Sequence, residues 1–87
     1  MAESDLQKKL QDLHDEIEKT QTDDEEKRAT LNELQSLIKQ AMDEPGDYHK
    51  RSLRERLSDS LLEFQVEHTS LTTSMERVFE HLSSLGI

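Results

Sequence analysis

The stretch LSDSLLEFQVEHTSLTTSMERVFEHLSSL, residues 57–85, decides the fold because its apolar side chains recur at two positions of a seven-residue repeat. Two apolar positions in every seven residues are typical of helices that pack side by side along a narrow line. We therefore predict helices here, with coiled-coil-like packing. We name the eight apolar residues of the repeat the C-terminal seam and place them at a core or an interface. They are Leu57, Leu61, Phe64, Leu71, Met75, Val78, Leu82 and Leu85.

His68 is the one polar residue in these two rows, and it lies in the Ser- and Thr-rich stretch EHTSLTTS. Ser and Thr weaken a helix interior and favour helix ends. The stretch is compatible with one long helix that bends near residues 68–70, or with two helices that meet there. We favour two, over residues 50–67 and 70–85. His68 could act as a pH-sensitive residue because histidine titrates near neutrality, although a residue at a helix junction is the simpler interpretation.

The first half of the chain carries two more helical patterns. One has the spacing 4, 3, 4 and consists of Leu6, Leu10, Leu13 and Ile17. The other is a wider apolar stripe over residues 31–42. The narrow stripe is of the heptad type, and the wider stripe is expected of a helix that packs on more than one neighbour. We predict helices over residues 3–19 and 23–43.

Residues typical of helix ends border these patterns. Thr22 is followed three residues later by Glu25, the spacing of a capping box at a helix start. After the last seam residue come Gly86 and Ile87. Glycine at this position permits the left-handed conformation that ends a helix, and an apolar residue after it can pack back onto the last turn. We predict that Thr22, Glu25 and Gly86 cap helices and that Ile87 joins the core.

Pro45 and Gly46 form a strong turn signal that divides the chain into halves of similar length. Helices joined by short connections pack as antiparallel neighbours. We therefore predict one all-α domain over residues 1–87, made of four short amphipathic helices in two helical hairpins, with a turn over residues 44–49. If residues 50–85 were one bent helix, the second hairpin would be replaced by that helix.

The composition limits the size of the core and the class of partner. Leu, Ile, Val and Phe supply only 20 of 87 residues, and the formal net charge is −9. Residues 1–48 account for −8 of that charge. An acidic surface repels nucleic acid and, where it binds by charge, favours basic partners. The sequence has no cysteine, which excludes disulfides, thiolate zinc sites and a catalytic thiol but does not reveal the redox compartment. It has no apolar run of about 20 residues and no signal-peptide core in MAESDLQKKL, so we expect a cytoplasmic protein outside the membrane.

Motifs that carry chemistry are weak in this sequence. The residues three positions before His14, His49, His68 and His81 are not carboxylates, unlike the Glu-x-x-His pairs of helical metal sites. His14 and Glu18 have helical i, i+4 spacing, but a single pair on an exposed face binds metal weakly. The basic run HKRSLRER lacks aromatic residues for nucleic-acid stacking. We expect no enzyme activity, cofactor, metal site, nucleic-acid partner or small-molecule substrate.

A recognisable pattern runs through nearly the whole chain: the stretches LQKKLQDLHDEI and TDDEEKR, then Phe64, His68 and Leu71, and the ending LSSLGI. In this pattern the sequence resembles a family of short bacterial proteins, domain of unknown function 4404. The family pattern has His-Pro where this chain has His68-Thr69, which leaves the helix break at that point optional. The resemblance implies a helical fold in a bacterial cytoplasm, and it implies no activity.

These observations favour a small, acidic, helical protein–protein interaction module. It would self-associate through its Leu-rich seams, with a dimer favoured, or it would bind a helix of another protein. The alternative is an acidic regulatory protein that presents residues 12–33 to a basic partner, as a mimic of nucleic-acid charge. Salt separates the two, because charge-driven binding is screened at 0.5 M and apolar packing is not.

Overall fold

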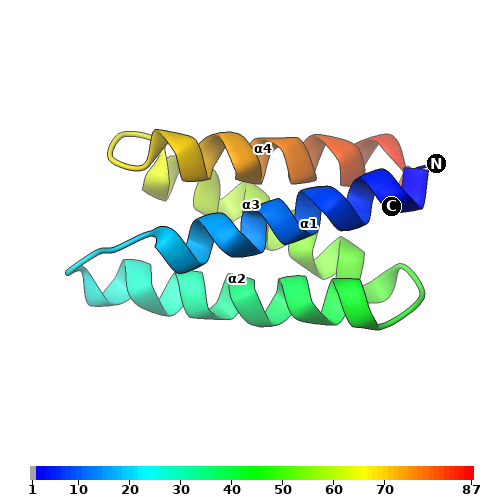
Figure 1. The fold of residues 1–87 in the computed structure, drawn as a ribbon, viewed down its shortest axis with the longest axis horizontal. Helices are drawn as coiled ribbons and strands as arrows, with labels where there is room; N and C mark the ends of the chain where they lie inside the picture. The colour runs from blue at the N-terminus through cyan, green and yellow to red at the C-terminus, as the bar shows by residue number, and fades with distance from the viewer. Residues whose placement is uncertain (1) are drawn as a thin grey trace.

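The structure is a computed structural model, and it describes residues 2–87. These residues form four α-helices, drawn in Figure 1: α1 Ala2–Lys19, α2 Glu25–Asp43, α3 Tyr48–Phe64 and α4 Thr69–Ser84. No strand occurs within the described part of the chain. The fold is therefore all-α, as predicted, and the predicted helix limits differ from the observed ones by at most three residues.

The helices form a four-helix bundle that is two helices across in each of its two short directions, with extents of 36 × 20 × 19 Å. Helix α1 packs against α2 and α4, and α3 packs against the same two helices. Helices α1 and α3 are therefore diagonal to each other and do not touch. Figure 1 shows both termini at one end of the bundle, together with the α2–α3 connection. Successive helices run in opposite directions, which agrees with the predicted pair of hairpins.

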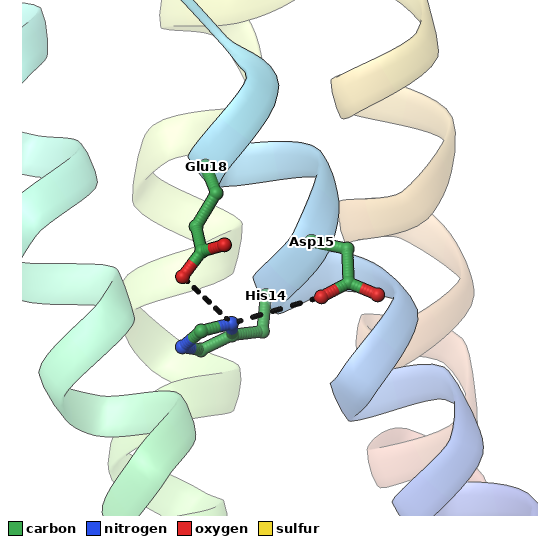
Figure 2. A group of neighbouring side chains, drawn as sticks. All are labelled: His14, Asp15 and Glu18. Atoms are coloured by element: carbon green, nitrogen blue, oxygen red, sulfur yellow. Dashed lines mark ion pairs between the residues drawn. The ribbon is translucent and has the colours of Figure 1, made fainter.

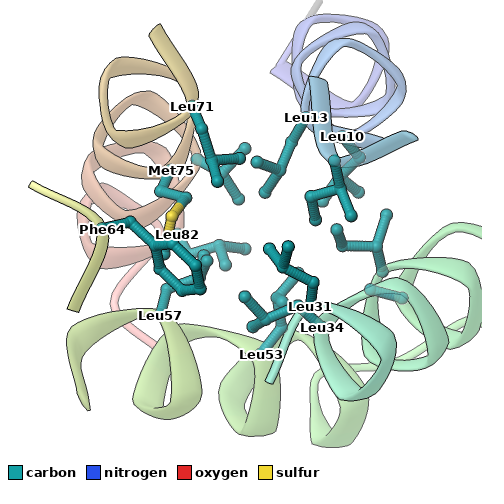
Figure 3. Close-up of a cluster of buried hydrophobic side chains, with 14 of the residues drawn as sticks. Leu10, Leu13, Leu31, Leu34, Leu53, Leu57, Phe64, Leu71, Met75 and Leu82 are labelled. Atoms are coloured by element: carbon teal, nitrogen blue, oxygen red, sulfur yellow. The ribbon is translucent and has the colours of Figure 1, made fainter. Parts of the chain in front are cut away.

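Apolar side chains from all four helices meet along the axis of the bundle, as Figure 3 shows. Six of the eight residues of the C-terminal seam are at most 1% exposed: Leu57, Phe64, Leu71, Met75, Val78 and Leu82. Leu61 is partly buried and packs against the same core, whereas Leu85 is 43% exposed. The facing side of the core is supplied by α1 and α2, through Leu10, Leu13, Leu34 and Ile38. The seam is thus covered by helices of its own chain.

The start of α2 differs from the predicted cap. The N-cap is Asp24, whose carboxylate accepts hydrogen bonds from the backbone N–H groups of Glu26 at 2.9 Å and Lys27 at 3.2 Å. Thr22 lies before the helix, and its hydroxyl accepts a hydrogen bond from the N–H of Asp24 at 3.2 Å. Glu25 is the first helical residue, so the Thr22–Glu25 capping box does not form. The carboxylate of Asp24 thus satisfies two of the backbone donors that have no partner within the helix.

Residues 50–85 form two helices, because the chain leaves the helical conformation at His68, where φ is −130° and ψ is 66°. The carbonyl of His68 accepts hydrogen bonds from both the N–H and the hydroxyl of Thr72, each at 2.9 Å. The Ser- and Thr-rich stretch thus contains the start of a new helix, as favoured from the sequence. Nε2 of the His68 ring is buried without a hydrogen-bond partner, and the ring lies 5.9 Å from that of Phe64.

Two glycines hold the positive φ angles that turns and helix ends require. Gly46 has φ 96° in the turn after Pro45, and Gly86 has φ 77° directly after the C-cap of α4. Ile87 is partly buried against the core, as the sequence predicted. The apolar residue after Gly86 therefore contributes to the closed end of the bundle.

Two leucines of α3 allow a matched test of this core. Leu57 is fully buried and Leu62 is 80% exposed, so the same substitution removes a core side chain in one case and a surface side chain in the other. Leu57→Ala should lower the free energy of unfolding by about 2–5 kcal/mol. Leu62→Ala should change it by less than about 0.5 kcal/mol, measured in dilute, monomeric protein. Urea denaturation monitored by circular dichroism measures both, and equal losses would contradict the arrangement.

Candidate functional site

One cluster of side chains has the composition of a metal site. His14, Asp15 and Glu18 lie on α1, on the side that turns toward α2, and Figure 2 shows the two carboxylates near Nδ1 of the imidazole. Nδ1 is 3.6 Å from a carboxylate oxygen of Glu18 and 4.0 Å from one of Asp15. The i, i+4 spacing of His14 and Glu18 brings these groups together on one helix face.

The cluster is open rather than enclosed. The side chains of Asp15 and Glu18 are 52% and 62% exposed, and that of His14 is 28% exposed. All three come from a single helix, whereas metal sites in helical bundles draw ligands from facing helices. Nδ1 of His14 is buried without a hydrogen-bond partner, and so is Oε1 of Gln35 on α2. The arrangement suits a local ion pair when His14 is protonated, and it offers a cation only a weak, flexible chelate.

The other histidines serve contacts within the fold. Nδ1 of His81 on α4 lies 3.0 Å from the ammonium of Lys9 on α1. His49 forms an ion pair with Glu44 across the α2–α3 turn. His68 marks the α3–α4 junction described above. The structure therefore does not bring the histidines together. His68, which the sequence favoured as a helix-junction residue over a pH-sensitive one, lies at one end of the bundle near the α1–α2 connection.

One ion pair connects α2 with α3, and a second connects α2 with the α3–α4 connection. Arg56 on α3 donates through Nε to the carboxylate of Glu33 on α2. The hydrogen bond to Glu33 raises the pKa of Arg56 above its usual value. Nearby carboxylates act in the same direction, whereas partial burial lowers the pKa. At the other pair, the ammonium of Lys27 lies 3.6 Å from the carboxylate of Glu67 and links α2 to the α3–α4 connection. Both pairs are partly exposed contacts within the fold, and each contributes little to stability.

The surface hollows are shallow and open to solvent. The hollow between α3 and α4 is lined by Arg54, Glu55, Ser58, Asp59 and Phe79. Another, where the two chain connections meet, is lined largely by polar residues of the segment 21–27 and by Glu67 and His68. A small-molecule site needs concave, mostly apolar walls that enclose the ligand. These hollows lack that shape.

Apolar residues outside the core form a surface feature that the sequence analysis missed. Leu62 is 80% exposed and Val66 is 85% exposed, one helical turn apart at the end of α3. Tyr48, at the start of α3, is 74% exposed. The sequence does contain a signal for this feature: Leu62 and Val66 are apolar but fall outside the two rows of the seven-residue repeat. We name Tyr48, Leu62 and Val66 the α3 outer face.

Comparison with known proteins supplies a family. The family described as Domain of unknown function (DUF4404) matches residues 6–87, nearly the whole chain, which confirms the resemblance drawn from the sequence. No curated protein and no solved structure matches the chain. None of the four helices within residues 2–87 is long and apolar enough to span a membrane.

A zinc titration tests the cluster at His14. If the cluster bound zinc with a Kd of about 1 mM, the addition of about 1 mM zinc would stabilise the fold by RT ln 2, about 0.4 kcal/mol. For a domain of this size that corresponds to a rise in Tm of about 2–3 °C. We expect a rise no larger than this, and we expect His14→Gln to remove the part that depends on the cluster. A rise of 10 °C that is lost in His14→Gln would show a true metal site and contradict the assignment as a surface ion pair.

Proposed function

Because the chain belongs to the DUF4404 family, whose description assigns no activity, we propose a function from the surface of the bundle: a non-enzymatic protein–protein interaction module that self-associates. The observation that carries the proposal is the exposure of Leu62 and Val66, at 80% and 85%, on a protein whose other large aliphatic side chains are mostly buried. Exposed apolar side chains that lie next to one another mark sites of contact with other proteins.

Burial of the C-terminal seam determines where such contacts form. A side chain that is at most 1% exposed, such as Phe64 or Leu71, touches another protein only if the bundle opens. Opening exposes the whole core and costs most of the stability of a domain of this size. Association therefore uses the α3 outer face, and the seam serves as the internal core that holds this face rigid.

The absence of enzyme activity is part of the proposal. Its support is the open shape of the surface hollows and the position of the carboxylate and histidine groups on exposed helix faces. Such positions leave reacting groups in water, where electrostatic stabilisation of a transition state is weak. A bacterial, cytoplasmic setting is likewise proposed, on the ground of the family resemblance.

A second candidate function rests on charge. Residues 12–33 contain nine carboxylates and three cationic side chains, and they form the end of the bundle around the α1–α2 connection. Asp12, Asp15, Glu18, Asp23 and Glu25 are exposed there. A basic partner would bind this end as it binds a nucleic-acid backbone, and that binding would be lost in high salt.

Light scattering after size-exclusion chromatography tests self-association over a hundredfold range of protein concentration. The chain has a mass of 10.1 kDa, and the proposal predicts an increase toward twice that mass as concentration rises. The increase should persist in 0.5 M salt, because apolar contacts are not screened. Leu62→Ser together with Val66→Ser should hold the protein at the monomer mass throughout.

The matched control is Leu85→Ser, which also replaces an exposed leucine but lies at the end of α4. This variant should associate as the unchanged protein does. A mass of 10.1 kDa at every concentration would contradict self-association and leave the acidic end of the bundle as the better candidate.

A further inference from the structure

Two methionines of the bundle lie in contrasting environments. Met75 on α4 is fully buried, and Figure 3 shows its side chain inside the core. Met42, in the last turn of α2, is only partly buried and packs against the edge of the same core. Its side chain lines an open hollow between the start of α1 and the end of α2. The core therefore shields one thioether from solvent, and the other borders the surface.

Met42 also lies at the least closely packed contact of the bundle. Helices α1 and α2 contact each other less than any other neighbouring pair. Figure 1 shows them diverging toward the end of the bundle that holds the α2–α3 connection. Near this end, the side-chain amide of Gln7 donates to the backbone carbonyl of Met42 at 3.2 Å, and this hydrogen bond is exposed. Leu6 and Ala41 are buried beside the same hollow. The apolar side chain of Met42 thus covers the edge of a weak contact.

A thioether has a reaction that the other apolar side chains lack. The sulfur lone pair attacks one oxygen of a hydroperoxide, the O–O bond breaks, and that oxygen stays on sulfur as a sulfoxide. The sulfur is oxidised by two electrons, and the hydroperoxide is reduced to an alcohol, or to water where it is hydrogen peroxide. The oxidant must reach the sulfur. A side chain that borders the surface reacts in the folded protein, whereas a buried one reacts only when the bundle opens.

We infer that Met42 is a site of oxidation by hydroperoxides, and that its sulfoxide loosens the start of α1 from the end of α2. The modification is reversible, because methionine sulfoxide is a substrate of dedicated reductases. The inference goes beyond the proposed self-association and does not depend on it. Leu62 and Val66 follow the other end of α3, away from the α2–α3 connection and from Met42.

The sulfoxide does not suit the position that the thioether occupies. Its oxygen is a strong hydrogen-bond acceptor, and burial of such a group without a donor costs stability. The hollow offers both space and donors, since Gln7 and Lys50 line it with an amide and an ammonium group. Oxidised Met42 therefore turns from the edge of the core toward the hollow. Leu6 and Ala41 lose part of their cover, and the contact between the two helix ends weakens.

Treatment of the folded protein with hydrogen peroxide tests the site. Peptide mapping by mass spectrometry follows the gain of one oxygen at Met42 and at Met75, and the peptide that carries Met1 is scored separately. Met42 should be oxidised at least about tenfold faster than Met75, because its sulfur is reached without opening of the bundle. In guanidinium chloride the two rates should become equal. Equal rates in the folded protein, or a difference that persists in guanidinium chloride, would overturn the inference.

The effect on the helix contact is measured on protein in which Met42 is fully oxidised. Its Tm should be about 4–8 °C lower than that of the reduced protein. Amide hydrogen exchange of residues 6–10 should become at least about tenfold faster, whereas α3 and α4 should keep their protection. Methionine sulfoxide reductases should restore both values. An unchanged Tm and unchanged exchange after full oxidation of Met42 would overturn the inference.

Two leucine variants locate the effect. Met42→Leu keeps the apolar volume without the thioether, so its Tm should stay within about 3 °C of the unchanged protein. Peroxide should then change neither Tm nor the exchange of residues 6–10, although Met1 and Met75 are still present. The matched control Met75→Leu should retain the full response to peroxide. A response that persists in Met42→Leu would trace it to another residue and contradict the inference.

Discussion

The structure depends on the mutual burial of four narrow apolar helix faces within a single short chain. Fifteen apolar residues in the described part of the chain are buried, and every helix contributes to them. Helices of 16 to 19 residues in proteins owe most of their stability to packing of an amphipathic face, so each helix here depends on the neighbours that cover its apolar face. Because few apolar residues are available, nearly all are committed to this core. The positions of the exceptions, Leu62 and Val66, are therefore informative.

The same constraint determines which parts of the surface can act. A closed core leaves function to exposed side chains, and most of these are acidic, as expected of a small protein that stays dissolved. Helix α3 departs from that pattern in three ways: it exposes apolar residues, it carries a net charge of +1 in a chain of −9, and its charges oppose its own dipole. The exposed apolar residues cost solubility in an isolated molecule, and the charges at the two ends of α3 cost helix stability. By contrast, the cluster around His14 on α1 has no feature beyond helical spacing.

Sequence reasoning predicted the number of helices, their limits and their antiparallel order, because apolar periodicity and the Pro45-Gly46 turn report directly on local structure. It misplaced the cap of α2, since Thr22 and Asp24 are both good cap residues and only backbone geometry decides between them. A seven-residue repeat has the same form in a bundle within one chain as between two chains, so the sequence left open whether the C-terminal seam was core or interface. The exposure of Leu62 and Val66 followed only once the buried side of α3 was known.

The central claim is that the core forms within one chain and that contact between chains is confined to α3. Isotope-filtered NMR on an equimolar mixture of labelled and unlabelled protein tests it most directly, since it separates contacts within a chain from contacts between chains. The account predicts that nuclear Overhauser effects linking Leu10 or Leu13 to Leu71 or Met75 arise within one chain. Effects between chains should involve Leu62 and Val66. Strong effects between chains among the buried core residues would show that helices are exchanged between copies, and would contradict the account.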